Sequence, residues 1–176
     1  EEAGTLQRMR EAGQLPLRVT HNDTKLNNVL LDKKTRKALC VLDLDTVMPG
    51  LVGHDFGDAI RFAANFVEED CRQAEKAGLN LNVFWAFAEG FLKKTAATLT
   101  DCEVDTLALS CFALACELAT RFLADYIVGD KYFKIKEPEH NLIRTRCQIA
   151  LAKDMLRKMD AMNAIVQDCA KRYKAK

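Results

Sequence analysis

The polar loop formed by residues 21–28, together with the two apolar segments that follow it, constrains the fold of this chain most strongly. Residues 29–31 and 38–42 are apolar, and the polar stretch 32–37 separates them. Two apolar runs joined by a short polar stretch are typical of a β-hairpin. The sequence therefore predicts a hairpin that begins directly after the polar loop.

A hairpin whose turn lies within residues 32–37 brings distant residues together. Antiparallel pairing places Asn28 opposite residues 41–42. Asn28 and Asp43 then leave the open end of the hairpin side by side, close to Asp23. The topology gathers two carboxylates and an amide at one place, as a metal site requires.

These three side chains are the set that phosphoryl transfer needs. We interpret Asp23 as the base that orients an acceptor hydroxyl, and Asn28 and Asp43 as magnesium ligands, since Mg²⁺ takes few hard oxygen ligands from the protein. We expect residues 38–42 to be buried, so Asp43 would be costly to desolvate without a cation beside it. The simpler alternatives are a loop Asp bonded to its own backbone, a turn Asn and a charged strand cap.

Three neighbours of this set are further candidates. Lys25 follows the base and could neutralise charge on the transferring phosphate. Asp45 is either an additional ligand or an acceptor outside the metal's ligand sphere, and the sequence leaves both open. His21 is interpreted as a structural residue that supports the loop by hydrogen bonds.

The triplet Asp55-Phe56-Gly57 matches the D-F-G of protein kinases, but it lies beyond Asp43, which already ends the hairpin. We interpret Gly57 and Asp58 as a helix entry, with Asp55 or Asp58 capping free backbone amides. The helix that they open carries Arg61 and Phe62. Both could face the same cleft as Asp23, with ordinary packing as the alternative for Phe62.

Arg121 and Tyr132 are candidates further along the chain. Arg121 interrupts the mostly apolar residues 114–127, where a guanidinium needs a carboxylate, a carbonyl or a ligand. Tyr132 follows Gly129 and Asp130 at the exit of an expected helix. A buried ion pair and ordinary packing are the alternatives.

Outside the hairpin, the pattern of apolar residues is mainly helical. We expect the last turns of a helix over residues 4–13, a short strand over 17–20, loop from 45 to 53, and helices over 59–66, 82–97, 100–129 and 138–173. Thr100 and Glu103 form a capping box, and Gly129 is a suitable helix stop. The fold class is therefore α+β, mainly α, with a small β-hairpin core and a helical bundle.

Composition excludes several classes of protein. The chain has 176 residues and a net charge of +1, which gives no sign of a nucleic-acid or membrane surface. No apolar run approaches about 18 residues, and the start lacks the features of a signal peptide. The seven scattered cysteines are interpreted as reduced core thiols of a cytoplasmic protein, not as zinc ligands.

Three segments carry a resemblance to a known family: residues 21–28 (HNDTKLNN), 42–50 (LDLDTVMPG) and 55–62 (DFGDAIRF). They resemble the aminoglycoside phosphotransferase and choline kinase superfamily, which has a protein-kinase-like fold. Within it they look closest to N-acetylhexosamine 1-kinases. Lys25 stands where many aminoglycoside kinases have His, which argues against an antibiotic substrate.

The resemblance implies ATP and Mg²⁺ as cofactors and the anomeric hydroxyl of N-acetylglucosamine or N-acetylgalactosamine as acceptor. It implies Asp23 as base, Asn28 and Asp43 as metal ligands, and Arg121, Tyr132 and Phe62 as sugar-binding residues. The resemblance covers almost the whole chain but only the C-terminal lobe of the family, so we expect residues 1–176 to form that lobe. The eight glycines form no G-x-G-x-x-G, so we expect the nucleotide lobe to be missing and these residues alone to be inactive.

Four other readings remain. The chain could transfer phosphate to another small alcohol, of the choline, aminoglycoside or homoserine type, or it could be a non-catalytic binding module with the kinase shape. A sulfatase is disfavoured because no cysteine is followed two residues later by Pro. A protein kinase is disfavoured because no Ala-Pro-Glu-like element follows Asp43.

Overall fold

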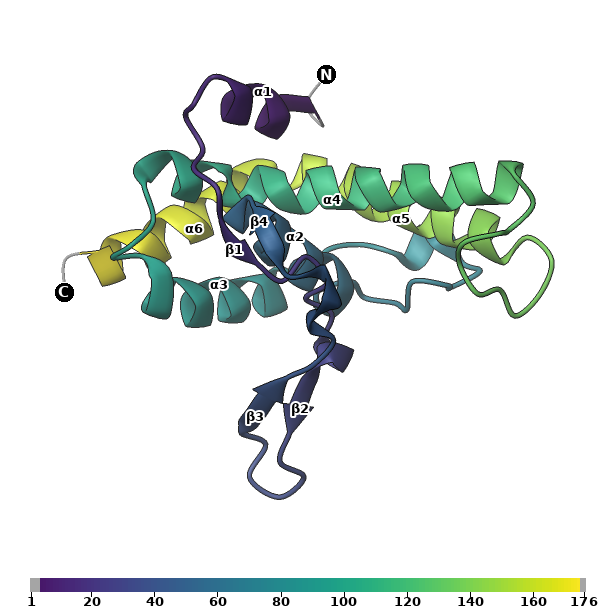
Figure 1. Cartoon of the computed structure of the whole chain (residues 1–176), viewed down its shortest axis with the longest axis horizontal. Helices are drawn as coiled ribbons and strands as arrows, with labels where there is room; N and C mark the ends of the chain where they lie inside the picture. Colours follow the sequence, from purple (N-terminus) through teal and green to yellow (C-terminus); the bar gives the residue numbers. More distant parts are fainter. Residues whose placement is uncertain (1–3, 175–176) are drawn as a thin grey trace.

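A computed structural model describes residues 4–174 (Figure 1). The prediction that the start of the chain lacks signal-peptide features falls partly on Glu1, Glu2 and Ala3, which lie outside the described residues. In chain order the elements are α1 (Thr5–Glu11), β1 (Arg18–Thr20), η2 (Leu26–Asn28), β2 (Val29–Leu31), β3 (Ala38–Val41), η3 (Leu44–Thr46), β4 (Met48–Gly50), α2 (Val52–Ala63), η4 (Ala74–Lys76), α3 (Leu81–Thr95), α4 (Asp101–Ile127), α5 (His140–Arg157) and α6 (Met159–Lys174). The prediction of an α+β, mainly α fold is confirmed.

The core lies among helices α2 to α6. Helix α4 packs against α5 on one side and α2 on the other, and α3 packs against α6 (Figure 1). Phe56 of α2 and Phe84 of α3 are fully buried and meet edge to face, with ring centroids 5.9 Å apart. Gly57 permits the close crossing of α2 and α4, because a Cβ there would lie 2.6 Å from the carbonyl oxygen of Ser110. This crossing fixes the position of α2, which supports the site described below.

Strand β4 was not expected from the sequence, which predicted loop there. It pairs antiparallel with β1, with Arg18 opposite Gly50 and Thr20 opposite Met48. The guanidinium of Arg18 donates to the buried carboxylate of Glu103 at 2.5 and 2.7 Å. Glu103 also completes the predicted capping box of α4, so the strand pair is tied to the start of that helix.

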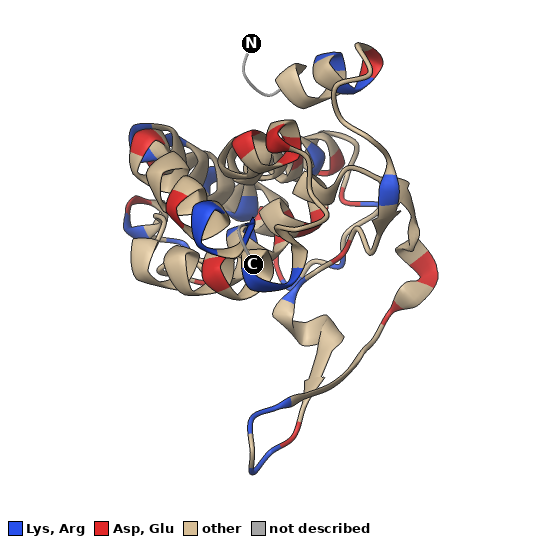
Figure 2. Ribbon diagram, turned by 90° about the vertical axis from the view of Figure 1, so that its left-hand side faces the viewer, with Lys and Arg blue, Asp and Glu red and all other residues tan. Residues whose placement is uncertain are grey.

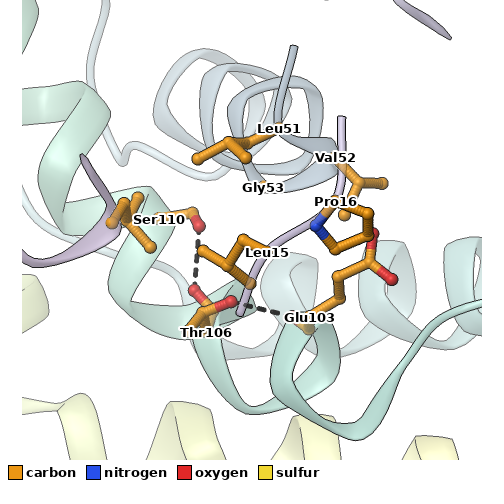
Figure 3. Close-up of a pocket in the computed structure, with 9 residues that line it drawn as sticks. Leu15, Pro16, Leu51, Val52, Gly53, Glu103, Thr106 and Ser110 are labelled. Atoms are coloured by element: carbon orange, nitrogen blue, oxygen red, sulfur yellow. Dashed lines mark hydrogen bonds between the residues drawn. The ribbon is translucent and has the colours of Figure 1, made fainter. Parts of the chain in front are cut away.

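A cavity of about 10 Å³ lies between the segment before β1, the start of α2 and the first turns of α4 (Figure 3). Leu15, Pro16 and Thr106 are among its lining residues, and the hydroxyl of Ser110 donates to the carbonyl of Thr106 at 2.8 Å. A space of this size is at the limit for a single water. It is a packing defect and not a candidate ligand site.

The hairpin of β2 and β3 confirms the predicted pairing but not the predicted burial. Val29 lies opposite Val41, and the amide of Leu42 donates to the carbonyl of Asn28 at 2.8 Å. All four residues of β3 are exposed, with Leu39 at 61%. The hairpin projects from the helical body (Figure 1), so its apolar side chains have no core to enter.

Two helix boundaries also differ from the predictions. Helix α2 begins at Val52, earlier than the predicted start at residue 59. The single helix predicted over residues 138–173 is two helices, α5 and α6, separated at Lys158. The ammonium of Lys158 bonds the carbonyl of Leu79 at 2.8 Å and the carboxylate of Asp154 at 2.6 Å, so this residue fixes the junction to the segment before α3.

Asp154 is a buried carboxylate, and its substitution should change the stability of the fold measurably. It is 8% exposed, and it accepts hydrogen bonds from the Leu79 amide at 2.8 Å and from Lys158. Burial by itself would raise the pKa of Asp154. These bonds and one from Arg157 lower the pKa by a larger amount, so it lies below the ordinary value. A depressed carboxyl pKa means that Asp154 stabilises the fold above about pH 4 and loses this effect as the pH falls through its folded pKa.

We predict that Asp154→Asn lowers the free energy of unfolding by about 1–3 kcal/mol at pH 7. The difference from wild type should shrink as the pH falls below about 4. Urea unfolding at a series of pH values measures it. Asp168→Asn is the control, because its carboxylate is 63% exposed and pairs with the exposed Arg172. A pH-independent difference at Asp154 would contradict the assignment.

The surface carries both signs of charge. Figure 2 shows acidic and basic residues distributed over the helices, and both signs occur at the tip of the hairpin. Three of the seven cysteines, Cys111, Cys147 and Cys169, are buried, whereas Cys40 is exposed on β3. The prediction of core thiols therefore holds for part of the set and is wrong for Cys40.

Helix α4 is the one described helix that is long and apolar enough, by length and composition, to cross a membrane. Its most apolar window has a mean hydropathy of 1.6, and 56% of that window is buried inside the protein. A buried core helix passes the same test, and α4 packs between α2 and α5.

Candidate active site

Helix α2 holds the polar loop after β1 in place. The carboxylate of Asp55 accepts hydrogen bonds from the amides of His21 at 2.9 Å and Asn22 at 2.8 Å. The carboxylate of Asp58 accepts one from the amide of Thr24 at 2.9 Å. The prediction that Asp55 or Asp58 caps its own helix is therefore wrong. Both lie inside α2, and they bind amides of the loop.

The chain after the hairpin adds a second set of contacts to this loop. The ring Nε2 of His21 lies 2.9 Å from the carbonyl oxygen of Leu42, next to Asp43. The hydroxyl of Thr46 donates to the carbonyl of His21 at 2.6 Å, and the Asn22 side chain donates to the carbonyl of Thr46 at 3.0 Å. These bonds agree with the interpretation of His21 as a structural residue, and they tie both ends of the hairpin to the loop.

Asp23 is held by two neighbours on its own loop. The ammonium of Lys25 lies 3.0 Å from one carboxylate oxygen, and the amide nitrogen of Asn28 lies 3.0 Å from the other. The side chain of Asp23 is 26% exposed, so it reaches solvent in this position. A fixed carboxylate with an open edge can accept a hydrogen bond, and then a proton, from an alcohol.

Asn28 is oriented so that one end of its amide stays available. Its nitrogen donates to both the carbonyl and the carboxylate of Asp23. Among the described residues, no hydrogen bond reaches its Oδ1. That oxygen is a hard donor of the kind that Mg²⁺ accepts.

Asp43 occupies an unusual backbone position. Its φ and ψ are 60° and 61°, a left-handed conformation that few residues other than Gly adopt. The side chain is exposed, so the desolvation argument made from the sequence is wrong. A hydrogen bond with the carboxyl of Asp45, and the charge of Asp45, raise the pKa of Asp43, and the charge of Asp23 adds to this.

Asp43 directly follows Leu42, whose carbonyl lies 2.9 Å from His21 Nε2, so Asp43 lies beside the loop that carries Asp23. Within residues 4–174 no three His, Cys, Asp or Glu side chains form a group that could hold a metal by themselves. Mg²⁺ needs only one or two protein carboxylates when phosphates and water complete its shell. One amide oxygen from Asn28 and one carboxylate from Asp43 fit this requirement, and a divalent cation would relieve the repulsion among the carboxylates.

A cleft of about 410 Å³ opens beside Asp23. Lys25 lines it together with Arg121 of α4 and Tyr132 of the following loop. Its walls include the apolar side chains of Leu114 and Leu118. The structure thus brings four of the predicted site residues, Asp23, Lys25, Arg121 and Tyr132, onto one cavity.

Arg121 is not buried, which rules out the buried ion pair that the sequence left open as its alternative. Its side chain is 45% exposed and lies 3.7 Å from the carboxylate of Glu117, one turn earlier on α4. The guanidinium also faces two rings, with its carbon 5.7 Å from the centroid of Tyr132 and 5.5 Å from that of Phe133. The apolar face of α4 points to the core, and Arg121 points to the cleft.

The loop that carries Tyr132 is fixed by the buried Asp125. Its carboxylate accepts hydrogen bonds from the amides of Lys131, Tyr132 and Phe133 at 2.8–2.9 Å. Burial by itself would raise the pKa of Asp125. The hydrogen bonds from these amides and from Asn141 lower the pKa by a larger amount, so it lies below the ordinary value. The backbone position of Tyr132 therefore follows from a buried charge on α4.

Phe62 is not brought to this cleft. It lines a second cavity, of about 650 Å³, with Phe66 and Arg144. Arg61 lies between the two and lines both. A role for Phe62 in sugar binding stays a prediction that the arrangement does not support.

Several lining residues were missed by the sequence reasoning. His54, Asp58 and Glu117 all face the cleft. Burial lowers the pKa of His54, although the charges of Glu117 and Asp55 act against this. Glu117 could have been found from its spacing of one helical turn before Arg121. Placing His54 and Asp58 on the cleft requires α2 to begin at Val52, a start that the sequence did not predict.

Comparison with known families agrees with this geometry. The phosphotransferase enzyme family matches residues 1–90. The match spans the polar loop, the hairpin and α2, which together build the surroundings of Asp23, Asn28 and Asp43. This chain belongs to the phosphotransferase enzyme family.

Proposed function

We propose that this protein is an ATP- and Mg²⁺-dependent kinase for a small sugar, and that it phosphorylates the anomeric hydroxyl of N-acetylglucosamine or N-acetylgalactosamine. Family membership supports phosphotransferase chemistry. The observation that carries the proposal is the Asp23 carboxylate, held by Lys25 and Asn28 at the edge of a cleft of about 410 Å³.

Each residue has a defined task in this proposal. Asp23 orients the acceptor hydroxyl and takes its proton late in the transfer. Lys25 places positive charge beside the phosphate that is transferred. Asn28, through Oδ1, and Asp43 would hold the Mg²⁺, which when bound neutralises charge on the nucleotide phosphates.

The cleft favours a neutral acceptor. Arg121 already faces the rings of Tyr132 and Phe133, so these rings are not free to receive a cation such as choline. The cavity is lined by three cations, Lys25, Arg61 and Arg121, and by three carboxylates, Asp23, Asp58 and Glu117, so its charges balance and a cationic acceptor gains no net attraction. Paired charged groups such as Glu117 and Arg121 can donate to and accept from adjacent sugar hydroxyls. These features support a sugar over an aminoglycoside or choline.

We further propose that the described residues form the C-terminal lobe of the kinase and that ATP is bound jointly with a second lobe. The absence of a G-x-G-x-x-G in residues 1–176 supports this. Apolar side chains on the hairpin, such as Leu39 at 61% and Val41 at 52% exposure, would gain a covering surface from such a lobe.

A sugar panel tests the proposal. The full-length protein is incubated with ATP, Mg²⁺ and N-acetylglucosamine, N-acetylgalactosamine, glucose, choline or an aminoglycoside, and phosphorus NMR identifies the position of the new phosphate. We expect 1-phosphates of the two N-acetylhexosamines. The matched control is the 1-O-methyl glycoside of N-acetylglucosamine, whose blocked anomeric oxygen should prevent transfer. Phosphate on another ring hydroxyl would contradict the 1-kinase assignment.

A further inference from the structure

Arg61 is a buried guanidinium that joins two carboxylates from different parts of the chain. Its side chain is 1% exposed. It donates to one oxygen of Asp58 from Nε at 3.1 Å and from Nη2 at 2.8 Å. Its third nitrogen, Nη1, donates to the carboxylate of Glu69. Glu69 belongs to residues 64–80, which connect α2 to α3.

The same Asp58 is bonded to the loop that carries Asp23. Arg61 occupies Oδ1 of Asp58, and the amide of Thr24 occupies Oδ2 at 2.9 Å. Thr24 lies directly between Asp23 and Lys25. An unbroken series of charge-assisted contacts therefore runs from Glu69 through Arg61 and Asp58 to the backbone beside Asp23.

Because Nη1 of Arg61 bonds to Glu69, Arg61 uses only Oδ1 of Asp58 and leaves Oδ2 to the amide of Thr24. Burial disfavours the charged form of Arg61, but the charges of Asp58 and Glu69 raise its pKa above the ordinary value. Without the charge of Glu69, Nη1 would keep at most a neutral acceptor, and Asp58 would be the one remaining carboxylate bonded to Arg61. The fork of a guanidinium matches both oxygens of one carboxylate. Arg61 would then compete with Thr24 for Oδ2 of Asp58.

We propose that Glu69 is a positioning residue of this kinase, which acts through Arg61 and Asp58 to hold the amide of Thr24 and thereby the orientation of Asp23. The inference rests on the proposed function. Arg144 supports Glu69 from the other side, with its Nε 4.0 Å from Oε1. The 4.0 Å separation of Arg144 from Glu69 is an ion-pair distance and not a hydrogen bond. Glu69 lines the second cavity, outside the cleft that contains Asp23, so its effect on the reaction is indirect.

Hydrogen exchange on the 176-residue chain tests the structural step without any need for turnover. In Glu69→Gln we expect the amide of Thr24 to exchange at least about tenfold faster, because its acceptor is shared with Arg61. The amide of Leu79, held by Asp154 at 2.8 Å, should be unchanged. Glu68→Gln is the matched control, since the Glu68 side chain lies outside the Arg61 pair. Unchanged exchange at Thr24, or equal acceleration at Thr24 and Leu79, would overturn the proposal.

Kinetics of the full-length protein test the functional step. Glu69→Gln should lower kcat about tenfold or more while KM for acceptor and nucleotide changes little, because misplacement of a reacting group affects the transition state most. Glu69→Asp, which keeps the charge, should recover part of the loss. A change in KM alone, or no recovery in Glu69→Asp, would contradict a positioning role.

The two proposals fail separately. If Asp23→Asn is inactive and Glu69→Gln is as active as wild type, the positioning role is wrong and the proposed function stands. If Asp23→Asn keeps full turnover, the proposed function is wrong whatever Glu69→Gln does.

Discussion

Asp23→Asn should lower kcat for phosphoryl transfer by about 10²–10⁴-fold in the full-length protein, the usual contribution of a positioned general base. The substituted amide keeps the size of the carboxylate and can still bond to Asn28, so the loop should keep its shape. It cannot accept the proton of the acceptor hydroxyl. It also removes the partner of Lys25, which lies 3.0 Å from Asp23 Oδ1.

This prediction requires that folding and ligand binding survive the change. Thermal unfolding and nucleotide affinity of Asp23→Asn should match wild type within error. Asp105→Asn is the control, because its carboxylate lies on the exposed side of α4, hydrogen-bonded by Gln167 at 2.6 Å. A variant at Asp23 that keeps more than about a tenth of wild-type turnover is outside the range expected for a general base and would favour the non-catalytic, kinase-shaped module.

Asp43→Asn should be the second most damaging change, with a loss in kcat/KM of about a hundredfold or more and a higher Mg²⁺ concentration for half-maximal rate. The exposed carboxylate of Asp43 is crowded by Asp45 and Asp23, which raise its pKa. A cation held there would relieve this repulsion. Neutralising Asp43 removes the anionic ligand and leaves only the amide oxygen of Asn28.

Asp45→Asn separates the two roles left open for that residue. A loss close to that of Asp43→Asn would indicate a direct ligand. A loss of about 10–100-fold with an unchanged Mg²⁺ requirement would indicate an acceptor outside the ligand sphere. Titration of rate against Mg²⁺ for both variants supplies the comparison. Wild-type Mg²⁺ dependence in Asp43→Asn would remove this residue from the metal site.

Local signals in the sequence predicted local structure well. The polar stretch between two apolar runs predicted the hairpin, and the amide of Leu42 does pair with Asn28 as the register required. Thr100 and Glu103 predicted the start of α4 because a capping box satisfies helix amides within one turn. The same pairing places Asn28 beside Leu42, the residue before Asp43, and Asn28 bonds to Asp23 at 3.0 Å. A metal site shared by Asp23, Asn28 and Asp43 stays a prediction.

The features that were missed depend on contacts distant in sequence. Helix α2 has no side-chain cap at Leu51, and Gly53 and Gly57 weaken its helical signal, so its early start was hidden. Those glycines are present because α4 crosses α2 closely at Ser110. With α2 started too late, Asp55 and Asp58 were assigned to capping, although they hold the loop around Asp23.

The sequence was also a poor guide to which side chains are exposed. The apolar run of β3 predicts burial, and the apolar surroundings of Arg121 leave a buried ion pair open as an alternative. The hairpin projects away from the helices, and α4 turns Arg121 outward toward Tyr132. Periodicity states which residues share a face, but not which face meets the core when several elements compete for it.

The most direct test of the central claim is the position of a bound divalent ion. Crystals of the full-length protein with Mn²⁺ in place of Mg²⁺ and a non-hydrolysable ATP analogue would give an anomalous peak. The account predicts a peak about 2.0–2.3 Å from both Oδ1 of Asn28 and a carboxylate oxygen of Asp43, with the acceptor hydroxyl beside Asp23. A peak held by other side chains, with Asn28 and Asp43 both outside its ligand sphere, would contradict it.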